Sequence, residues 1–213
     1  MMLCAVGNEK GGVGKSTIVV NLAVEYCRRG LDVLIVEADP TVRTVSNWKE
    51  DRGTDCPDAP FVPVVRQTGK IHAELVDLDK RYDLVLVDLP GKDSQEMRSA
   101  LLVADLFLVP CQPSQADLDA TVALTDTIDD SLMYNEDLKA AVVLNRVSTH
   151  AWSRDESDAR EMLAESFDTV LKTVLHERKA FSRSLHGLTV TEGSDYAAAG
   201  ELQSLADNIE ECV

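Results

Sequence analysis

Aromatic residues and long apolar runs are both scarce in this chain of 213 residues. Aromatic residues make up only 5%, so the core must be built from valine, leucine, isoleucine and alanine, as expected of buried parallel strands covered by helices. No stretch reaches the roughly 18 consecutive apolar residues of a membrane span. The N-terminus lacks the basic segment and apolar segment of a signal peptide. The sequence therefore predicts a cytoplasmic protein.

Positive charge is also scarce, because 37 acidic residues face only 21 lysines and arginines and the formal net charge is -16. That sign is wrong for a protein whose whole surface attracts nucleic acid or anionic lipid, although it leaves room for a local basic patch. The five cysteines are scattered and form no C-x-x-C pair, which argues against a zinc ribbon or a thioredoxin-type redox motif. An iron–sulfur cluster bridging two chains remains a minor alternative.

Strand and helix patterns alternate along the chain. Apolar runs predict strands at residues 3–6, 32–37, 83–88, 106–110 and 140–144. Amphipathic runs predict helices at residues 15–29, 41–51, 71–80, 94–104, 115–132, 156–166 and 197–209. The proline-rich segment from Gly53 to Pro63 is expected to be a loop that flanks an edge strand at best. This order predicts one α/β domain over residues 1–213, with a mostly parallel twisted sheet and helices on both faces.

The strongest chemical pattern follows the first predicted strand and opens the first helix: Lys10-Gly11-Gly12-Val13-Gly14-Lys15-Ser16-Thr17. This is the context that a phosphate-binding loop (P-loop) requires. Glycines let the backbone N–H groups point at phosphate oxygens, and the helix N-terminus adds partial positive charge. We expect Lys15 to reach the β- and γ-phosphates of ATP and the Ser16 hydroxyl to ligate Mg²⁺. The alternative is a glycine-rich turn flanked by surface lysines.

The loop departs from the general pattern G-x-x-x-x-G-K-[ST], because Glu9 stands at the position of the first glycine. Lys10 turns the run into K-G-G-x-G-K-[ST], the deviant Walker A signature. With this signature the sequence resembles the ParA/MinD family of ATPases, and within it the short, ParF-like partition proteins that lack an N-terminal DNA-binding extension. The resemblance covers nearly the whole chain and includes Glu37-Ala38-Asp39-Pro40, Asn47-Trp48, Val87-Asp88-Leu89-Pro90-Gly91, Val109-Pro110, Pro113-Ser114, Asp117 and Asn145-Arg146.

The resemblance implies that Lys10 crosses a dimer interface to the nucleotide of the partner. A second cation there would stabilise transition-state charge and make dimerisation depend on ATP. The alternative for Lys10 is a solvated loop charge. Asp39 is implied to orient the attacking water, whereas its alternative role is to cap the helix expected from Thr41. Glu37 stands where the family often has Asp, so we assign it no metal role.

Asp88 ends an apolar strand, as a Walker B carboxylate would, and is expected to hold Mg²⁺ directly or through water. A charge that ends a buried run is costly unless it is paired or metal-linked; the alternative is a simple strand-end cap. Pro90-Gly91 is then expected to begin a switch segment that senses the γ-phosphate. The resemblance gives Asn145 adenine recognition through its side-chain amide, and a turn-forming asparagine is the alternative.

A local excess of positive charge lies between Lys172 and His186, with Glu177 as the single acid. The resemblance implies that this side of the protein binds nonspecific DNA through Lys172, Arg178, Lys179 and Arg183. Such phosphate contacts are salt-sensitive, and the alternative is a helix face with ordinary solvated basic residues. The C-terminal segment has an apolar stripe but an acidic polar face, so we expect it to pack on the domain rather than on a membrane.

These features together predict a DNA-partition ATPase. ATP and Mg²⁺ would assemble a sandwich homodimer that binds nonspecific DNA, and a ParB-like centromere-binding or adaptor protein would stimulate slow hydrolysis. The protein would then be associated with the nucleoid. A positioning ATPase for a non-DNA cargo would share the catalytic residues, and an ATP-dependent ligase or synthetase would need an acceptor site for which no further motif is present.

Overall fold

All strands of the central sheet run parallel to their neighbours, in the order β3-β2-β4-β1-β5-β6-β7. The computed structural model describes residues 1–150 and 155–212. In these residues the strands are β1 Met2–Val6, β2 Val33–Glu37, β3 Val64–Arg66, β4 Leu84–Asp88, β5 Leu106–Cys111, β6 Lys139–Val147 and β7 Val170–His176. The α-helices are α1 Lys15–Arg28, α2 Thr44–Asp55, α3 His72–Asp79, α4 Gln95–Leu101, α5 Gln115–Leu132, α6 Asp155–Ala164, α7 Lys179–Arg183 and α8 Tyr196–Cys212.

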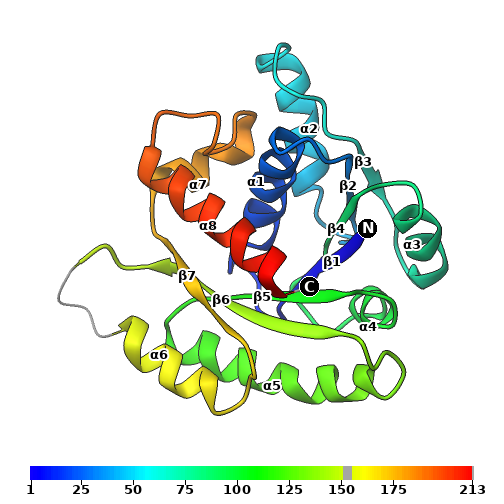
Figure 1. Ribbon diagram of the computed structural model, residues 1–213, viewed down its shortest axis with the longest axis vertical. Coiled ribbons are helices and arrows are strands. Elements are labelled where there is room, and N and C mark those ends of the chain that lie inside the picture. Colours follow the sequence, from blue (N-terminus) through cyan, green and yellow to red (C-terminus); the bar gives the residue numbers. More distant parts are fainter. Residues whose placement is uncertain (151–154, 213) are drawn as a thin grey trace.

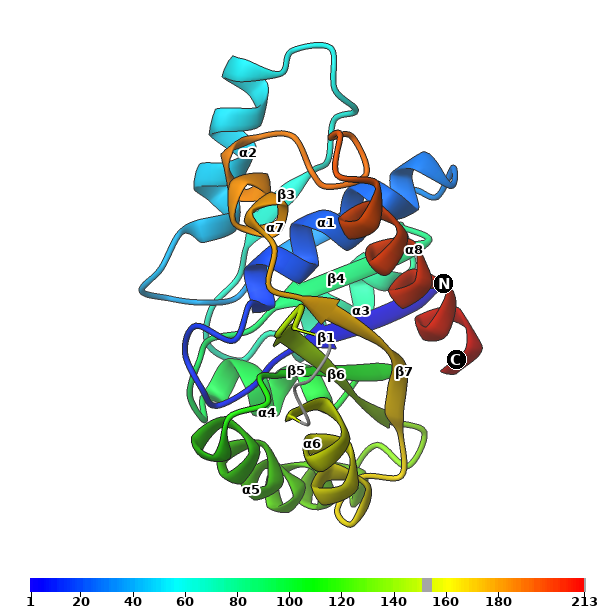
Figure 2. The same cartoon turned by 90° about the vertical axis from the view of Figure 1, so that its left-hand side faces the viewer.

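The sheet lies between two helical layers and has a separate apolar core on each face (Figure 1, Figure 2). Side chains alternate between these cores along each strand, so Leu84 and Leu86 pack with α1 and α8, whereas Val85 and Val87 pack with the layer of α3 to α6. Continuous apolar strands are therefore needed, because parallel strands are buried on both faces. The predicted fold class is confirmed.

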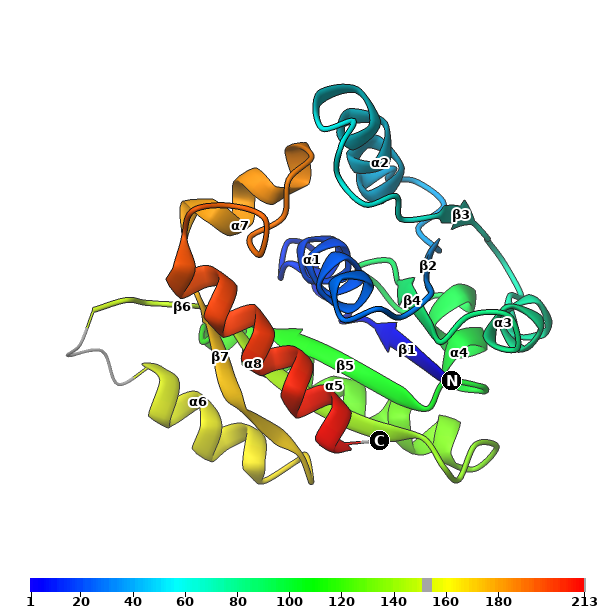
Figure 3. The same ribbon diagram turned by 45° about the horizontal axis from the view of Figure 1, so that its top comes forward.

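The C-terminal helix α8 covers one edge of the sheet, where it packs on β7 and on α1 (Figure 3). The apolar stripe that the sequence placed on this helix is fully buried, and it consists of Leu202, Leu205, Ala206 and Ile209. The expectation that this segment packs on the domain is thus confirmed. Within the described part of the chain, no helix is both long and apolar enough to cross a membrane.

A buried ion pair fixes α2 to the segment that precedes α8. The Arg52 guanidinium donates two hydrogen bonds to the Glu192 carboxylate, at 2.8 and 2.7 Å. Glu192 also accepts hydrogen bonds from the backbone and hydroxyl of Thr189. Although burial opposes ionisation of Glu192, the bonds from Arg52 and Thr189 outweigh it and lower the pKa of the carboxyl.

The structure corrects the expectations for α2 and for the interval from Lys172 to His186. Helix α2 begins three residues later than expected and continues through Gly53 into the segment predicted as a loop. A three-residue edge strand, β3, follows that segment, in agreement with the edge strand that the sequence allowed there. The interval from Lys172 to His186 is not one helix face: it contains most of β7, then the short α7 and a 3-10 turn. Polar residues interrupt β7 because it is an edge strand, and this breaks the apolar run on which strand prediction depends.

Candidate nucleotide-binding site

The polar residues singled out in the sequence meet at the carboxyl edge of the sheet. The P-loop leaves the end of β1, and Asp39 follows the end of β2. Asp88 ends β4 and lies in register with Val6 of β1 and Glu37 of β2. Asn145 lies in the last part of β6. In open α/β sheets this is the edge at which ligands bind.

The P-loop adopts a conformation that depends on its glycines. Gly12 and Gly14 have φ angles of 83° and 98°, in the left-handed region that residues with a Cβ avoid. A Cβ on Gly14 would also collide with the Nδ2 atom of Asn145. That Nδ2 donates a hydrogen bond of 2.7 Å to the carbonyl of Val13, so Asn145 fastens the loop to β6. The absence of a side chain at Gly14 therefore leaves the room that the Asn145 amide needs to reach the loop.

Lys15 is buried under the loop that it follows. Its Nζ donates hydrogen bonds to the carbonyls of Asn8 at 3.3 Å and Lys10 at 3.0 Å. Burial lowers the pKa of Lys15, and the negative charges of Asp88 and Asp39 oppose this effect. Gly91 of the expected switch segment is close by, since a Cβ there would lie 3.1 Å from Lys15 Nζ. Because burial disfavours the charged form of Lys15, an anionic ligand bound in the loop would stabilise its ammonium group.

Ser16 and Asp88 form a pair of oxygen ligands suited to Mg²⁺. The Ser16 hydroxyl donates a hydrogen bond of 2.7 Å to Asp88 Oδ2. The other carboxylate oxygen, Oδ1, is buried without a hydrogen-bond partner in the described residues. Burial raises the pKa of Asp88 from 3.8 to about 7, against the lowering effects of Ser16 and Lys15. An orphaned buried carboxylate oxygen beside a hydroxyl fits a site that a bound divalent cation completes, and Mg²⁺ held there would neutralise phosphate charge.

Asp39 caps a turn beside the loop. Its Oδ1 accepts hydrogen bonds from the backbone N–H of Thr41 and Val42 and from the Thr41 hydroxyl. Partial burial opposes ionisation, but these three bonds outweigh it and lower the pKa of Asp39. The alternative role of Asp39 as a cap on a helix from Thr41 is wrong, because α2 begins at Thr44 and has Arg43 at its N-cap. Asp39 instead caps the turn that precedes this helix. Asp39 also lines the cavity over the P-loop.

Glu37 binds the first turn of α2. Its Oε1 accepts hydrogen bonds from the backbone N–H groups of Val45 and Ser46, at 2.8 and 3.2 Å. Its Oε2 accepts a bond from the Ser46 hydroxyl and pairs with Arg66 at 3.2 Å. A carboxylate at the first turn of α2 satisfies donors that have no partner within the helix. The longer glutamate side chain spans from the end of β2 to this helix.

Two cavities meet along the P-loop. One has a volume of about 310 Å³ and lies against Lys15, Ser16, Asp39, Asp88 and Gly91. The other has a volume of about 210 Å³ and is lined by Asn145, the segment from His176 to Lys179, Phe181 and Ser182. Gly14, Thr17 and Arg146 line both. A ligand with a polyphosphate in the first cavity would place its other end in the second, beside Asn145.

Lys10 is half exposed at the start of the loop. Its backbone is fixed, since its N–H donates a 2.9 Å hydrogen bond to Asn8 Oδ1 and its carbonyl accepts the bond from Lys15. None of the ion pairs among residues 1–150 and 155–212 involves its ammonium group. The loop thus holds the backbone of Lys10 in place and leaves its side chain for another contact.

Three further residues of the site were missed in the sequence. Asn8 is fully buried and holds the start of the loop through bonds from its Nδ2 to the Pro110 carbonyl and the Thr121 hydroxyl, both 2.9 Å. Gln112 donates a 3.1 Å bond to the Gly12 carbonyl. Arg146 has a φ of 55°, and no other non-glycine residue in the described ranges has a positive φ. The Asn145-Arg146 motif was a signal for Arg146, but nothing in the sequence indicated its backbone strain.

The structure does not bring all four basic candidates for DNA binding together. Lys172 is exposed on β7, and Arg183 is exposed at the end of α7. Arg178 and Lys179 line the second cavity beside Asn145. Arg178 is also bound to Glu201 of α8, at 3.0 Å from its Nε and 2.7 Å from its Nη2. Only Lys172, Lys179 and Arg183 of these four therefore present an exposed side chain.

Three features of this site define a P-loop nucleotide-binding protein. They are the glycine-rich loop between a strand and a helix, the buried lysine, and the serine that is hydrogen-bonded to a strand-end aspartate. The comparison with protein families agrees, because residues 4–190 match the CobQ/CobB/MinD/ParA nucleotide-binding domain. The chain belongs to this ParA/MinD family of P-loop ATPases, as the motifs predicted.

Individual relatives cover most of the chain. The chain is 28% identical to "Protein ParA" of Rhizobium radiobacter, over 97% of this chain and 95% of that protein. It is 35% identical to "Maintenance of carboxysome distribution protein A" of Halothiobacillus neapolitanus, over 67% of this chain and 65% of that protein. Its fold is similar to that of the septum site-determining protein MinD of Pyrococcus horikoshii in complex with Mg-ADP, with a TM-score of 0.74, 19% identity and coverage of 99% and 96%. That last likeness shows the fold alone.

Proposed function

We propose that the protein is a Mg²⁺-dependent ATPase that forms an ATP-dependent homodimer, binds nonspecific DNA and moves a DNA cargo in partition. A ParB-like centromere-binding or adaptor protein would stimulate its hydrolysis of ATP to ADP and phosphate. The cluster of Lys15, Ser16 and Asp88 carries this proposal, since its unpaired carboxylate oxygen and buried cation suit a metal–triphosphate ligand. The structurally similar MinD of Pyrococcus horikoshii, described with Mg-ADP, supports the same ligand class.

Within the site, each residue would have a distinct task. Gly11 to Thr17 would bind the phosphates, with Lys15 on the transferred phosphoryl group and Ser16 and Asp88 as the holders of Mg²⁺. Asp39, fixed by its bonds to Thr41 and Val42, would orient the attacking water. Asn145 would meet the adenine in the second cavity while its Nδ2 stays on the loop.

The dimer part of the proposal depends on Lys10. Its backbone is held by Asn8 and Lys15, while its ammonium group takes part in no ion pair among the described residues. A fixed lysine with a free charge, at the mouth of a phosphate site, is suited to bind the nucleotide of a second copy. Because the γ-phosphate would then be shared between two copies, its loss on hydrolysis would release the dimer.

The DNA part depends on Lys172, Lys179 and Arg183. A dimer would double this exposed charge, and the contacts would be electrostatic and independent of sequence. The net charge of -16 opposes them, so binding would fall steeply with salt. A positioning ATPase for a non-DNA cargo is the second candidate, favoured by the relative named for maintenance of carboxysome distribution and by the dispersal of the four basic residues.

The test is retention on nonspecific duplex DNA at low salt, together with size-exclusion chromatography and phosphate release. Each is measured with ATP, with ADP, and with ATP for the Lys10→Ala variant. The Lys80→Ala variant is the matched control, since it removes an exposed lysine at the end of α3. We expect ATP-only retention and ATP-only dimers, both lost in Lys10→Ala and unchanged in Lys80→Ala.

The outcomes separate the candidates. ATP-dependent dimers without DNA retention in any state would refute the DNA carrier and favour another cargo. Dimers that form equally with ADP, or in Lys10→Ala, would refute the nucleotide-switched interface. An absence of phosphate release in every condition, with or without DNA, would refute the ATPase.

A further inference from the structure

Strand β6 has one residue more than its neighbour β7 where the two strands reach the nucleotide site. Asn145 lies opposite Leu175 of β7, and Val147 lies opposite His176. Arg146 between them has no counterpart and forms a β-bulge. Bulges are rare between parallel strands and frequent beside functional sites, where they redirect a side chain. The φ of 55° at Arg146 belongs to the left-handed region that glycine adopts most easily, so an arginine there indicates that its side chain has a use.

The bulge turns Arg146 toward the nucleotide site. Val143 belongs to the core under α1, and Leu144 belongs to the core on the other face of the sheet. In a regular strand this alternation would place Arg146 in the core with Leu144, and Val147 under α1. Val147 instead packs in the core of Leu144, because the extra residue shifts the alternation by one position. Arg146 is thereby kept out of that core, and its side chain is exposed.

The surrounding structure holds the bulge in a fixed place beside the P-loop. The N–H of Arg146 donates a 2.9 Å hydrogen bond to Asn145 Oδ1, while Asn145 Nδ2 donates to the Val13 carbonyl of the loop. On the other side, the Val147 carbonyl accepts a 2.9 Å bond from the N–H of Glu177. Strained residues persist where their surroundings fix them in this way, and they are concentrated at ligand sites.

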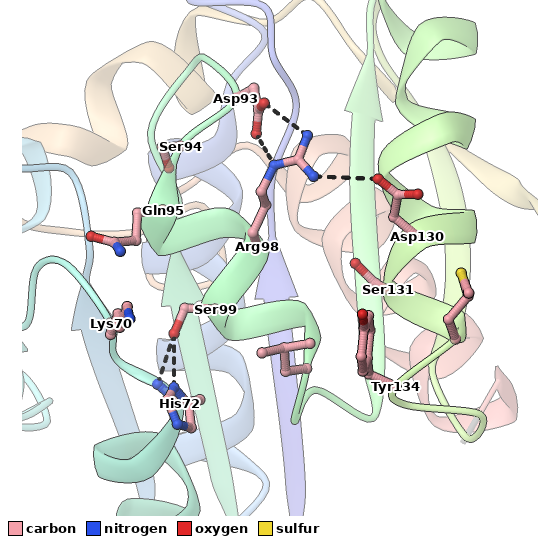
Figure 4. Close-up of a pocket in the computed structure, with 12 residues that line it drawn as sticks. Lys70, His72, Asp93, Ser94, Gln95, Arg98, Ser99, Asp130, Ser131 and Tyr134 are labelled. Atoms are coloured by element: carbon pink, nitrogen blue, oxygen red, sulfur yellow. Dashed lines mark hydrogen bonds and ion pairs between the residues drawn. The ribbon is translucent and has the colours of Figure 1, made fainter.

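The guanidinium of Arg146 is available for a ligand. In the described part of the chain, it takes part in no hydrogen bond and no ion pair. Arg98 provides a comparison, since it is also exposed and lines a cavity of about 880 Å³ over α4. Figure 4 shows that Arg98 is bound on both sides, by two 2.9 Å bonds to Asp93 and one of 3.4 Å to Asp130. The charge of Arg98 is thus satisfied within the fold, whereas that of Arg146 is not.

Arg146 lies at the junction of the two cavities along the P-loop, because it lines both. Of the described residues that line the first cavity, Lys15 and Arg146 are the cations, and Asp39 and Asp88 are the acids. Asn145 lines the second cavity. With the terminal phosphates beside Lys15 and the nucleoside beside Asn145, the phosphate at the junction is the α-phosphate, which is bonded to the ribose. A guanidinium can hold two oxygens of one phosphate through parallel N–H groups.

We propose that the guanidinium of Arg146 binds the α-phosphate of the bound nucleotide. That this nucleotide is ATP or ADP rests on the proposed function. Both nucleotides carry the α-phosphate, so Arg146 holds the ligand before and after hydrolysis, whereas Lys10 is assigned to the γ-phosphate, which is lost. The site thus gains a contact that supports affinity without distinguishing ATP from ADP.

The test is titration calorimetry of the full chain with Mg-ADP and with the Mg²⁺ complex of the non-hydrolysable β,γ-imido analogue of ATP. Arg146→Gln and Arg146→Gly should each weaken both ligands by the same factor, between about tenfold and a hundredfold, because a charge-assisted contact is lost. Arg146→Lys should retain part of the affinity, since an ammonium supplies the charge without the planar fork. Arg81→Gln is the matched control and should bind both ligands like the wild type, because Arg81 is exposed before β4, at the opposite edge of the sheet.

Two further measurements distinguish a ligand contact from a structural role. Arg146→Gly also removes the backbone strain, so it should unfold at no lower temperature than the wild type. A loss of affinity in a protein of undiminished stability cannot come from damage to the fold. In ³¹P NMR of bound ADP, the α-phosphorus resonance should shift between the wild type and Arg146→Gln by more than the β-phosphorus resonance.

Equal affinity of the wild type and Arg146→Gln for ADP would overturn the proposal. A loss confined to the ATP analogue would overturn it as well, because the contact would then be to the γ-phosphate. A ³¹P shift confined to the β-phosphorus would have the same consequence. A chain that binds ADP with the expected dependence on Arg146 but hydrolyses no ATP would refute only the proposed function.

Discussion

Replacing Asp88 by asparagine should stabilise the metal-free protein while it removes the response to Mg²⁺. The side chain is only 3% exposed, and its Oδ1 has no hydrogen-bond partner in the described residues. Asparagine keeps an oxygen that can accept the bond from the Ser16 hydroxyl, but it carries no charge. The variant therefore removes the cost of a buried carboxylate with little change in shape.

The size of the effect follows from the pKa of Asp88, which burial raises from 3.8 to about 7. A shift of about three pH units corresponds to on the order of 4 kcal/mol between the two protonation states. Because the folded protein binds this proton more tightly than the unfolded chain, ionisation of Asp88 costs stability. That cost is absent below about pH 4, grows as the pH rises to about 7, and is complete above that pH.

The assay is thermal and urea unfolding in EDTA, at about pH 5 and pH 8, for wild type, Asp88→Asn and the exposed-site control Asp58→Asn. At pH 8 we expect Asp88→Asn to be more stable by about 2–4 kcal/mol, or on the order of 10 °C in Tm. The difference should be smaller at pH 5, and Asp58→Asn should follow the wild type. Equal stability of Asp88→Asn and wild type at pH 8, or a difference independent of pH, would refute the reasoning.

Arg146→Gly should raise the free energy of unfolding in urea by roughly 0.5–1 kcal/mol, because Arg146 has a φ of 55°, in the left-handed region that glycine adopts without strain. Equal free energies of unfolding for Arg146→Gly and Arg146→Ala would contradict this. Gly14→Ala should abolish nucleotide binding in calorimetry, whereas Gly11→Ala should fold normally, since its Cβ would meet nothing within 4 Å. Glu192→Gln should cost roughly 3 kcal/mol at pH 7 by breaking the buried pair with Arg52. Because the fold lowers the pKa of Glu192 below its ordinary 4.5, this loss should diminish as the pH falls from 4.5 through the lowered pKa of the folded state; a loss of constant size over that range would exclude the ion pair as its cause.

The sequence was informative where one short segment determines the geometry. The P-loop places Lys15 and Ser16 by local chain direction alone, and the apolar strand that ends at Asp88 must lie inside a parallel sheet. Their meeting at one sheet edge follows from the rule that ligands bind at the carboxyl ends of such strands. The roles of Lys10, Asp39 and Asn145 in binding and hydrolysis remain predictions, because they concern a nucleotide or a second copy of the chain.

What the sequence could not show depends on contacts between distant segments. Asn8 bonds to Thr121, which is 113 positions away, and Gln112 bonds to Gly12, 100 positions away. No local pattern reports such pairs. The strand β7 was missed for a related reason: its identity as an edge strand comes from pairing with β6, while its own sequence mixes apolar and polar residues.

The charges around the P-loop explain why metal and triphosphate should act together on this site. Burial lowers the pKa of Lys15 and raises that of Asp88, so the folded protein disfavours the charged form of both groups. A triphosphate alone would relieve Lys15 but would add negative charge near Asp88 and Asp39. A divalent cation alone would relieve Asp88 but would lie close to Lys15. Only the combined ligand offers an anion to Lys15 and a cation to Asp88, and this complementarity favours the Mg²⁺ complex of ATP over either component.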